Sequence, residues 1–365
     1  MHIKTLRENT VRSIALTCCA LLMSTFSVAS DLRVNFGEKI DRIGEEAIAN
    51  NEAPGISIAM AEGDEIIYAK GFGYANLGTQ EEATPNHIFR LASVSKQFTS
   101  ASIMQLVDAG KVNTADPITK YFPDFPPAAQ KVHVSHLLQH TSGIGIEGGL
   151  KILSKYFHRS ENDTEPIPEG YGIVFDFEAG EKFMYSNTAY YLLGIIIEQV
   201  SGQLFSDYLQ EHIFDPVGMK NTAYGPSDYP TSQFARGYRL DGEEFKDERK
   251  FDMSIPFGAG GLVSTVGDLV LWQQALVNGR VVSPESFTRM RETGVLNSGK
   301  RFNGGFGIFV GHDNGSRVIS HSGNISGFSS ALTYFPRTDI TIAVQTNLRN
   351  GNSREILKRI STALF

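Results

Sequence analysis

Strand-like patterns lie at both ends of the chain, and helical patterns fill the long middle. Residues 55–61 and 65–71 are β-rich runs separated by Gly63-Asp64, which predicts a hairpin. Further strands are expected near the C-terminus, at residues 305–310, 317–321, 328–335 and 339–346. Strands from the two ends of one chain can share a sheet, so we expect a single antiparallel sheet built from both termini.

Helical patterns supply the layers that would cover this sheet. Apolar residues at helical spacing predict helices over residues 34–50 and 354–364, both expected on one face of the sheet. Further helical segments, each followed by a glycine-containing stop signal, are residues 95–108, 189–200 and 268–277. The predicted fold class is therefore α/β. Its sheet lobe would comprise residues 34–92 and 301–365, with a helical lobe over about 93–300 and a functional cleft in the seam between them.

The N-terminal segment has the pattern of a secretory signal peptide. Three basic residues within the first 12 positions precede an apolar run at residues 14–23, and the small residues at 27–30 suit cleavage. We therefore expect residues 1–30 to be removed, leaving residues 31–365 as one exported domain, periplasmic or secreted. A membrane anchor is the alternative, but the apolar run is too short to span a bilayer comfortably. No stable membrane insertion is expected after cleavage.

Cysteine content and charge narrow the function classes. Cys18 and Cys19 both lie inside the signal segment, so the mature chain would have no disulfide, thiol nucleophile or cysteine metal ligand. A lipid anchor on one of them is the alternative to cleavage. The net charge is −7 at pH 7, and removal of residues 1–30 leaves 30 basic against 39 acidic residues. An acidic exported protein is a poor candidate for binding nucleic acid or anionic lipid.

Ser93-Val94-Ser95-Lys96 places a hydroxyl and an amine three residues apart, at the start of a predicted helix. Side chains at i and i+3 share a helix face, so Lys96 can reach the Ser93 hydroxyl. A serine is a weak nucleophile at its ordinary pKa and needs an adjacent base, which a desolvated, neutral lysine can be. The spacing therefore predicts Ser93 as a nucleophile and Lys96 as its base, provided that partner residues occur downstream.

Tyr185-Ser186-Asn187 is the first candidate partner, because it lies on a loop that leads into the predicted 189–200 helix. A phenol carries protons usefully only if its pKa of about 10 is lowered, and an ammonium at Lys96 would lower it. The Asn187 amide can hold Lys96 through its carbonyl and bind substrate through its NH₂ group. We therefore predict Tyr185 as a proton-transfer residue and Asn187 as a substrate-binding residue. A half-buried core tyrosine is the alternative for Tyr185.

His321-Ser322-Gly323-Asn324 closes a predicted strand and is the second candidate partner. A strand edge at a glycine lets a substrate backbone approach closely and lie alongside as an extra strand. A backbone N–H group there can also face a developing oxyanion. All four residues are therefore predicted to line the substrate site. A plain strand terminus with an exposed histidine is the alternative.

No metal or organic cofactor is expected. His133, His136 and His140 form the nearest histidine cluster, but no carboxylate accompanies them, so a metal site is disfavoured. Hydrogen bonding by His140 before the turn that follows is the preferred interpretation. The Gly-Lys-Ser/Thr fingerprint of phosphate-binding loops is absent from the sequence.

In combination, these motifs resemble those of the β-lactamase-related serine hydrolases. The resemblance is carried, in chain order, by residues 89–99, 137–144, 183–187, 258–265 and 321–335. That group includes class C β-lactamases, D-alanyl-D-alanine carboxypeptidases, D-aminopeptidases and family VIII esterases. The resemblance implies a β-lactamase/transpeptidase-like α/β/α sandwich with an antiparallel sheet and a helical lobe. It also implies Ser93 as the acylated nucleophile, with Lys96 and Tyr185 as proton-transfer partners. The backbone N–H groups of Ser93 and Asn324 would form the oxyanion hole.

One motif departs from the pattern of this family. Lys-Thr-Gly is usual where this chain has His321-Ser322-Gly323. A lysine helps to hold the carboxylate of a β-lactam or a peptide terminus, whereas a histidine is only partly charged near neutral pH. The departure favours an esterase or a D-amino-acid peptidase, with a class C-like β-lactamase or D-Ala-D-Ala carboxypeptidase as the alternative. A catalytically inactive receptor for peptidoglycan fragments is the non-enzymatic alternative. The expected partners are small esters, β-lactams or D-amino-acid peptides, and the oligomeric state stays open.

Residues 145–180 show no clean periodicity, and their glycines, prolines and charges predict a long loop. A lid over the cleft and a surface loop without function are equally compatible with that pattern.

Overall fold

The computed structural model describes residues 36–365 apart from 147–149, 159–168, 226–232 and 249–250. The predicted signal peptide, residues 1–30, lies outside the described residues. Among the described helices, none has the length and apolar character needed to cross a membrane.

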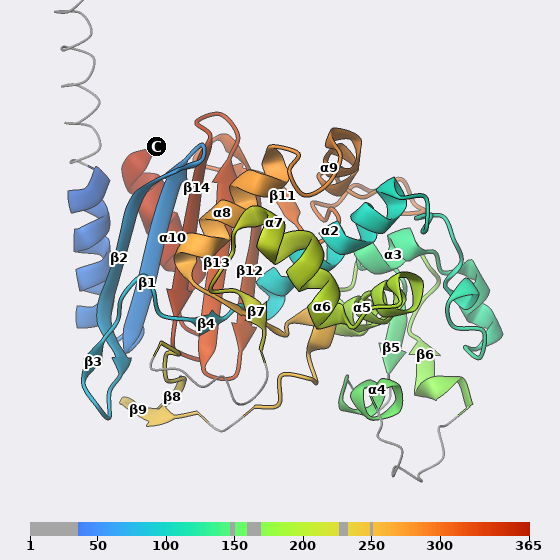
Figure 1. The fold of residues 1–365 in the computed structure, drawn as a ribbon, viewed down its shortest axis with the longest axis horizontal. Helices are drawn as coiled ribbons and strands as arrows, with labels where there is room; N and C mark the ends of the chain where they lie inside the picture. Colours follow the sequence, from blue (N-terminus) through green and yellow to red (C-terminus); the bar gives the residue numbers. More distant parts are fainter. Residues whose placement is uncertain (1–35, 147–149, 159–168, 226–232, 249–250) are drawn as a thin grey trace, which may run out of the picture.

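A seven-stranded sheet forms the frame of the fold, and both ends of the chain build it (Figure 1). Its order is β11-β12-β13-β14-β1-β2-β3, and the paired strands are antiparallel throughout. The strands are β1 (Gly55–Glu62), β2 (Glu65–Asn76), β3 (Glu81–Glu82), β11 (Phe309–Asp313), β12 (Ser316–Ile325), β13 (Phe328–Phe335) and β14 (Ile340–Thr346). The pairing of β1 with β14 joins the N-terminal hairpin to the C-terminal strands. The prediction of one antiparallel sheet drawn from both termini is confirmed.

The predicted bounds of β1, β13 and β14 agree with the structure within one residue, whereas β2 runs to Asn76 and β12 to Ile325, past their predicted ends at residues 71 and 321. The predicted strand that corresponds to β11 is misplaced. β11 begins at Phe309, whereas the sequence pattern placed a strand over 305–310. The N–H of Gly305 donates to the Ile308 carbonyl, and Gly307 has a φ of 70°, so this stretch turns instead of extending. The apolar residues of the predicted strand are therefore split between a turn and a shorter strand.

Helices cover both faces of the sheet. The helix over residues 36–49 and α10 (Ser353–Leu364) share one apolar cluster, which includes Ile40, Ile58, Val344 and Ile360. On the other face α8 (Val266–Val277) packs against β14 and β1. The chain therefore has the predicted α/β/α layers.

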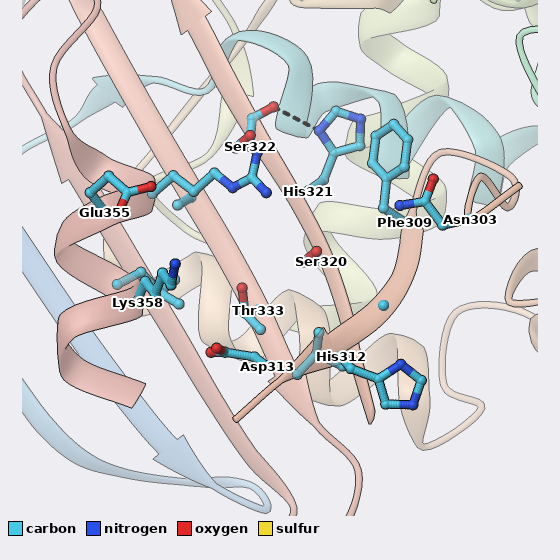
Figure 2. Close-up of a pocket in the computed structure, with 15 residues that line it drawn as sticks. Asn303, Phe309, His312, Asp313, Ser320, His321, Ser322, Thr333, Glu355 and Lys358 are labelled. Atoms are coloured by element: carbon cyan, nitrogen blue, oxygen red, sulfur yellow. Dashed lines mark hydrogen bonds between the residues drawn. The ribbon is translucent and has the colours of Figure 1, made fainter. Parts of the chain in front are cut away.

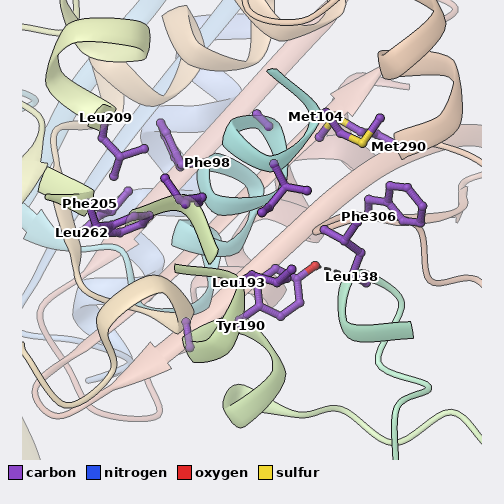
Figure 3. Packing of buried hydrophobic residues seen from close by; sticks show 14 of the residues in the cluster. Phe98, Met104, Leu138, Tyr190, Leu193, Phe205, Leu209, Leu262, Met290 and Phe306 are labelled. Carbon is purple, nitrogen blue, oxygen red and sulfur yellow. Dashed lines mark hydrogen bonds between the residues drawn. The ribbon is translucent and has the colours of Figure 1, made fainter. Parts of the chain in front are cut away.

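The helical lobe packs around α2 (Ser95–Asp108), which is buried along most of its length. Two helices, α5 (Asn187–Ser201) and α9 (Pro284–Met290), contact it, and α3 (Val134–Leu138) and α6 (Phe205–Leu209) pack against α5. Figure 3 shows side chains from α2, α5 and α6 interlocking in this core. Phe98 of α2 stacks on Trp272 of α8 with ring centroids 3.9 Å apart, so the helical lobe and the sheet layer share a continuous core.

Shorter elements complete the described chain. A three-stranded sheet consists of β4 (Phe89–Arg90), β10 (Leu262–Ser264) and β7 (Ala223–Tyr224). Other short elements include the β8 (Tyr238–Asp241) and β9 (Glu244–Asp247) pair and α7 (Asp215–Val217). Single-turn helices lie at Ile118–Lys120, Pro127–Lys131, Gln210–Phe214 and Phe257–Ala259.

The segment predicted as a long loop, residues 145–180, contains regular structure where it is described. It holds β5 (Ile144–Ile146), α4 (Leu150–Phe157) and β6 (Ile173–Phe175), with β5 paired to β6. Phe157 stacks on Tyr171 at 4.9 Å and lies 6.4 Å from the Tyr191 ring of α5. These tertiary aromatic contacts anchor a stretch whose sequence has no periodicity of its own.

Candidate active site

Ser93 lies in the short 3₁₀ helix Ala92–Val94, which leads from β4 into α2. Ala92 has a φ of 49°, a left-handed conformation that is uncommon for a residue with a Cβ atom. The turn leaves Ser93 partly exposed, whereas both flanking residues are buried. Backbone conformations of this kind concentrate at functional sites, where the surrounding structure enforces them.

Lys96 is fully buried, and its Nζ atom contacts three oxygen atoms. The Ala259 carbonyl lies at 2.6 Å, Asn187 Oδ1 at 2.8 Å and Ser93 Oγ at 3.1 Å. The first two oxygens can only accept hydrogen bonds, whereas the hydroxyl can also donate one. A neutral amine has two N–H donors and one lone pair, so donation to the two carbonyl oxygens leaves the lone pair for the Ser93 O–H. Burial lowers the pKa of Lys96 well below its usual 10.5, which favours this neutral form.

The Tyr185 side chain lies close to both Ser93 and Lys96. Lys96 Nζ lies 4.8 Å from the centroid of its ring, and its phenol is near enough to the Ser93 hydroxyl for that group to act on the phenol pKa. Tyr185 is 39% exposed, so part of the residue is open to solvent. The predicted lowering of its pKa is wrong. Desolvation by the surrounding protein raises the pKa of Tyr185 above 10, against the smaller effect of the Ser93 hydroxyl, and a neutral Lys96 supplies no charge to reverse it.

The N-terminus of α5 places Tyr185 and Asn187. Ser186 is the N-cap of the helix, where its hydroxyl accepts a hydrogen bond from the Ala189 N–H at 3.1 Å. Tyr185 therefore precedes the helix and Asn187 begins it. The structure brings both residues to Lys96, although their predicted roles in proton transfer and substrate binding stay predictions.

Gly323 of β12 is pressed against the turn that carries Ser93. A Cβ atom on Gly323 would lie 2.4 Å from the Leu91 carbonyl oxygen and 2.7 Å from the Ser93 backbone nitrogen, so only glycine fits. This close approach sets the edge of β12 beside the nucleophile, as a substrate-binding strand requires. The Asn324 side chain is turned to Asn350, whose N–H donates to its Oδ1 at 2.9 Å. The oxyanion-binding role of the Ser93 and Asn324 N–H groups stays a prediction.

His321 is 4% exposed, not an exposed strand end (Figure 2). Its Nδ1–H donates to the Ser322 carbonyl at 2.7 Å, and its ring lies 5.3 Å from that of Phe309. Burial, followed by the proximity of Lys96, lowers the pKa of His321 to about 3. The prediction that His321 carries partial positive charge near neutral pH is therefore wrong.

Ser322 points away from the seam. Side chains alternate along a strand, so Ser320 and Ser322 face the side opposite to His321 and Gly323. With Thr333 they line a hollow of about 520 Å³ between α10 and β11, bordered by Glu355 and Lys358 (Figure 2). Hydroxyls and charges of this kind suit a solvated sheet face. The structure therefore does not bring the Ser322 hydroxyl to the candidate site, and only its carbonyl contributes, through His321.

The histidine cluster separates into two parts. His136 Nδ1 accepts the His133 N–H at 3.0 Å and the two rings stack, so this pair caps α3. His140 lies in the seam instead, where its Nδ1 accepts the Ser186 N–H at 3.0 Å. Among the described residues no group of three His, Cys, Asp or Glu side chains could hold a metal ion.

Sequence reasoning missed two contributors to the site. One is the Ala259 carbonyl that binds Lys96, and the other is the His140 ring that stacks on Tyr185 at 4.3 Å. Both belong to segments that carry the family resemblance, residues 258–265 and 137–144, and that membership was the available signal. No pattern in the chain identifies a particular carbonyl as the partner of a distant lysine.

Comparisons with known proteins found similar sequences and similar folds. The Beta-lactamase family profile matches residues 40–364. Penicillin-binding protein 4* of Bacillus subtilis (strain 168) is 31% identical over 326 residues, which are 85% of this chain and 72% of that protein. Protein flp of Staphylococcus aureus (strain MW2) is 27% identical over 339 residues, 90% of this chain and 66% of its own length. The crystal structure of D-amino acid amidase from Ochrobactrum anthropi SV3, complexed with L-phenylalanine amide, has a TM-score of 0.75 and 26% identity, covering 90% of this chain and 98% of that one.

Proposed function

The chain belongs to the Beta-lactamase family, and on that premise we propose that it is an exported serine hydrolase that cleaves an ester or amide through an acyl-enzyme on Ser93. One observation carries the proposal. The buried Lys96 has two fixed carbonyl acceptors and a third contact to the Ser93 hydroxyl. A neutral lysine held in this way is a general base aimed at one proton.

The proposed acylation follows from these contacts. Ser93 Oγ bonds to the substrate carbonyl carbon while its proton passes to the lone pair of Lys96. The backbone N–H groups of Ser93 and Asn324 would donate hydrogen bonds to the oxyanion. Tyr185, which its raised pKa keeps protonated, donates its proton to the leaving oxygen or nitrogen as that bond breaks. The proton held by Lys96 then replaces the one that Tyr185 gave up, so the two residues work as one relay.

Deacylation uses the same relay in reverse. A water molecule attacks the acyl carbon, and the Lys96/Tyr185 pair takes one of its protons. Collapse of the second tetrahedral intermediate breaks the bond to Ser93 Oγ, which recovers its proton, and the acid product leaves. The two residues share the proton, so their titration belongs to the pair.

The neutral state of His321 limits which substrates the site can recognise by charge. A buried imidazole with a pKa of about 3 offers no positive charge for the carboxylate of a β-lactam or a peptide terminus. The structural similarity to D-amino acid amidase, over 98% of that chain, also supports an amide or ester substrate. The similarity to penicillin-binding protein 4* supports the alternative, a class C-like β-lactamase or D-Ala-D-Ala carboxypeptidase. The contact between Lys96 and the Ser93 hydroxyl disfavours an inactive peptidoglycan-binding scaffold, because such a scaffold needs no base beside a serine.

A substrate panel on purified residues 31–365 tests the proposal. We expect turnover of a short-chain p-nitrophenyl ester or a D-alanyl amide to exceed that of a chromogenic cephalosporin. Ser93→Ala should lower turnover at least about 10³-fold, as for other covalent nucleophiles, without changing Tm. Ser102→Ala is the matched control, because that hydroxyl donates within α2, to the Phe98 carbonyl at 3.0 Å. Retention of most activity by Ser93→Ala would reject the proposal.

Two further measurements complete this test. A fluorophosphonate should add once, on the peptide that contains Ser93. Export is tested separately, by N-terminal sequencing of the protein from the periplasm or medium of an expressing bacterium. We expect the mature chain to begin at Asp31.

A further inference from the structure

His140 contacts the segment that carries Tyr185 at three successive residues. Its backbone carbonyl accepts the Met184 N–H at 2.9 Å, and its ring Nδ1 accepts the Ser186 N–H at 3.0 Å. Between these hydrogen bonds its ring stacks on the Tyr185 ring, with centroids 4.3 Å apart and an interplanar angle of 25°. Met184, Tyr185 and Ser186 therefore all contact the same residue, His140.

The other surroundings of His140 hold its ring in place. The residue is 3% exposed and has a φ of 59°, a left-handed conformation at the end of α3. The Tyr190 ring lies 4.9 Å from the His140 ring and the Phe183 ring lies 5.9 Å away. Tyr190 is itself fixed by its hydroxyl, which donates to the Leu138 carbonyl at 2.8 Å (Figure 3). The imidazole therefore has one available orientation, with Tyr185 and Tyr190 as its closest ring neighbours.

The hydrogen bond to Ser186 requires a neutral imidazole. Nδ1 accepts there, so the proton of the ring is on Nε2, and an imidazolium would lose the bond. Lys96 and His321 are the titratable groups that act on the ring besides the two tyrosines. Burial is the main reason that the pKa of His140 lies well below 6.5, and repulsion from any positive charge on Lys96 or His321 would lower it further. The contact with Ser186 consequently persists across the pH range in which a hydrolase of this kind would work.

We infer that His140 is a positioning residue, which aims the Tyr185 phenol at the Ser93–Lys96 pair without touching the reacting atoms. The inference rests on the proposed function for its catalytic meaning, because it assigns His140 to the orientation of a proton donor. A small misplacement of a reacting group slows a reaction strongly, since a shift of about 1 Å can lower the rate about 10²-fold. The two hydrogen bonds from Met184 and Ser186 to His140 restrain the backbone on both sides of Tyr185. The stacked His140 ring restrains the Tyr185 side chain, so a shift of the phenol is opposed.

A double-mutant cycle separates positioning from a merely structural role. His140→Phe keeps an aromatic ring for the stack and removes the acceptor for Ser186. We expect it to lower kcat about 10-fold or more with little change in KM, by the misplacement argument above. In a Tyr185→Phe background the same substitution should lower kcat no further, because no phenol is left to aim. The decrease in Tm should be equal in both backgrounds. Equal fold-losses of kcat in both backgrounds would overturn the inference.

A second variant and a control sharpen the cycle. His140→Asn tolerates the left-handed φ and offers an Oδ1 acceptor, so it should recover part of the kcat lost in His140→Phe. Failure of asparagine to exceed phenylalanine would contradict the role of the Ser186 hydrogen bond. His136→Phe is the matched control, because that ring stacks on His133 and caps α3. It should lower Tm without any kcat effect that depends on Tyr185.

Amide hydrogen exchange tests the clamp independently of turnover. In His140→Phe the Ser186 amide should lose protection, whereas the Met184 amide should keep it, because its partner is a backbone carbonyl. Unchanged protection at Ser186 would overturn the inference even in an active enzyme. If the wild-type protein hydrolyses no substrate of the panel and Ser93 is not labelled, the proposed function fails, and the exchange result still decides whether His140 holds the segment.

Discussion

The two faces of the central sheet are built for different purposes. On the face covered by α10 and the helix over residues 36–49, one apolar cluster joins the helices to the sheet, with Ile58, Val344 and Ile360 fully inaccessible. At the seam near β12, the buried set includes an amine and two imidazoles, Lys96, His140 and His321. Apolar burial stabilises a fold directly, whereas a buried polar group costs free energy unless it has partners. The cluster under α10 therefore contributes stability alone, whereas the seam adds buried polar groups to an apolar core of its own.

The partners in the seam explain how the fold tolerates its polar groups. Lys96 has three oxygen contacts, and the ring of His140 accepts a backbone N–H. His321 is satisfied at Nδ1 only, and its Nε2 is buried without a protein partner among the described residues. The free energy lost in desolvation favours the neutral forms of all three, and a neutral lysine is the form that can act as a base.

Substitutions in the seam should have the largest effect on activity, and they test the contrast between the seam and the apolar cluster under α10. Lys96→Ala should lower kcat/KM at least about 10²-fold, the contribution typical of a general base, and Tyr185→Phe should do the same. The double variant should be little worse than either single variant, because the two groups share one relay. The wild-type rate should fall as pH falls through the depressed pKa of Lys96, since protonation occupies its lone pair. Losses that multiply in the double variant would show that the residues act separately.

On the apolar face the expected effect is one of stability alone. Ile360→Ala removes a fully buried side chain between α10 and the sheet, which should lower the free energy of unfolding by about 2–5 kcal/mol. Urea denaturation measures that change, and the kcat per folded molecule should stay at the wild-type value. A fall in kcat at unchanged stability would break the division between the two faces.

The smallest expected effect concerns the charge of His321. Burial lowers the pKa of His321 from 6.5 to about 3. The ring is therefore neutral above that pH and gains a positive charge only below it. Between pH 5 and 8 a neutral ester and a carboxylate-bearing ester should therefore show pH–rate profiles of the same shape. A falling limb near pH 6.5 that is confined to the carboxylate substrate would mean that His321 does bind anions as a cation.

Local patterns predicted much of this architecture. The boundaries of α2, α5, α10, β13 and β14 follow the apolar periodicity and the glycine stop signals within about two residues. The strand β11 and the segment 145–180 were predicted less well, because turns at Gly305 and Gly307 and the stacking of Phe157 on Tyr171 depend on distant contacts.

The sequence by itself determined which groups could meet: the three-residue spacing puts Ser93 within reach of Lys96, and the order of strands and helices puts both in a seam. Only the tertiary structure decided their charge states. Charge depends on how completely a group is removed from water and on which atoms surround it, and neither is a local property of the chain. That is why Tyr185 has a raised pKa and not a lowered one, and why His321 is a buried neutral ring. It is also why His140, which the sequence marked only as a turn residue, packs against Tyr185.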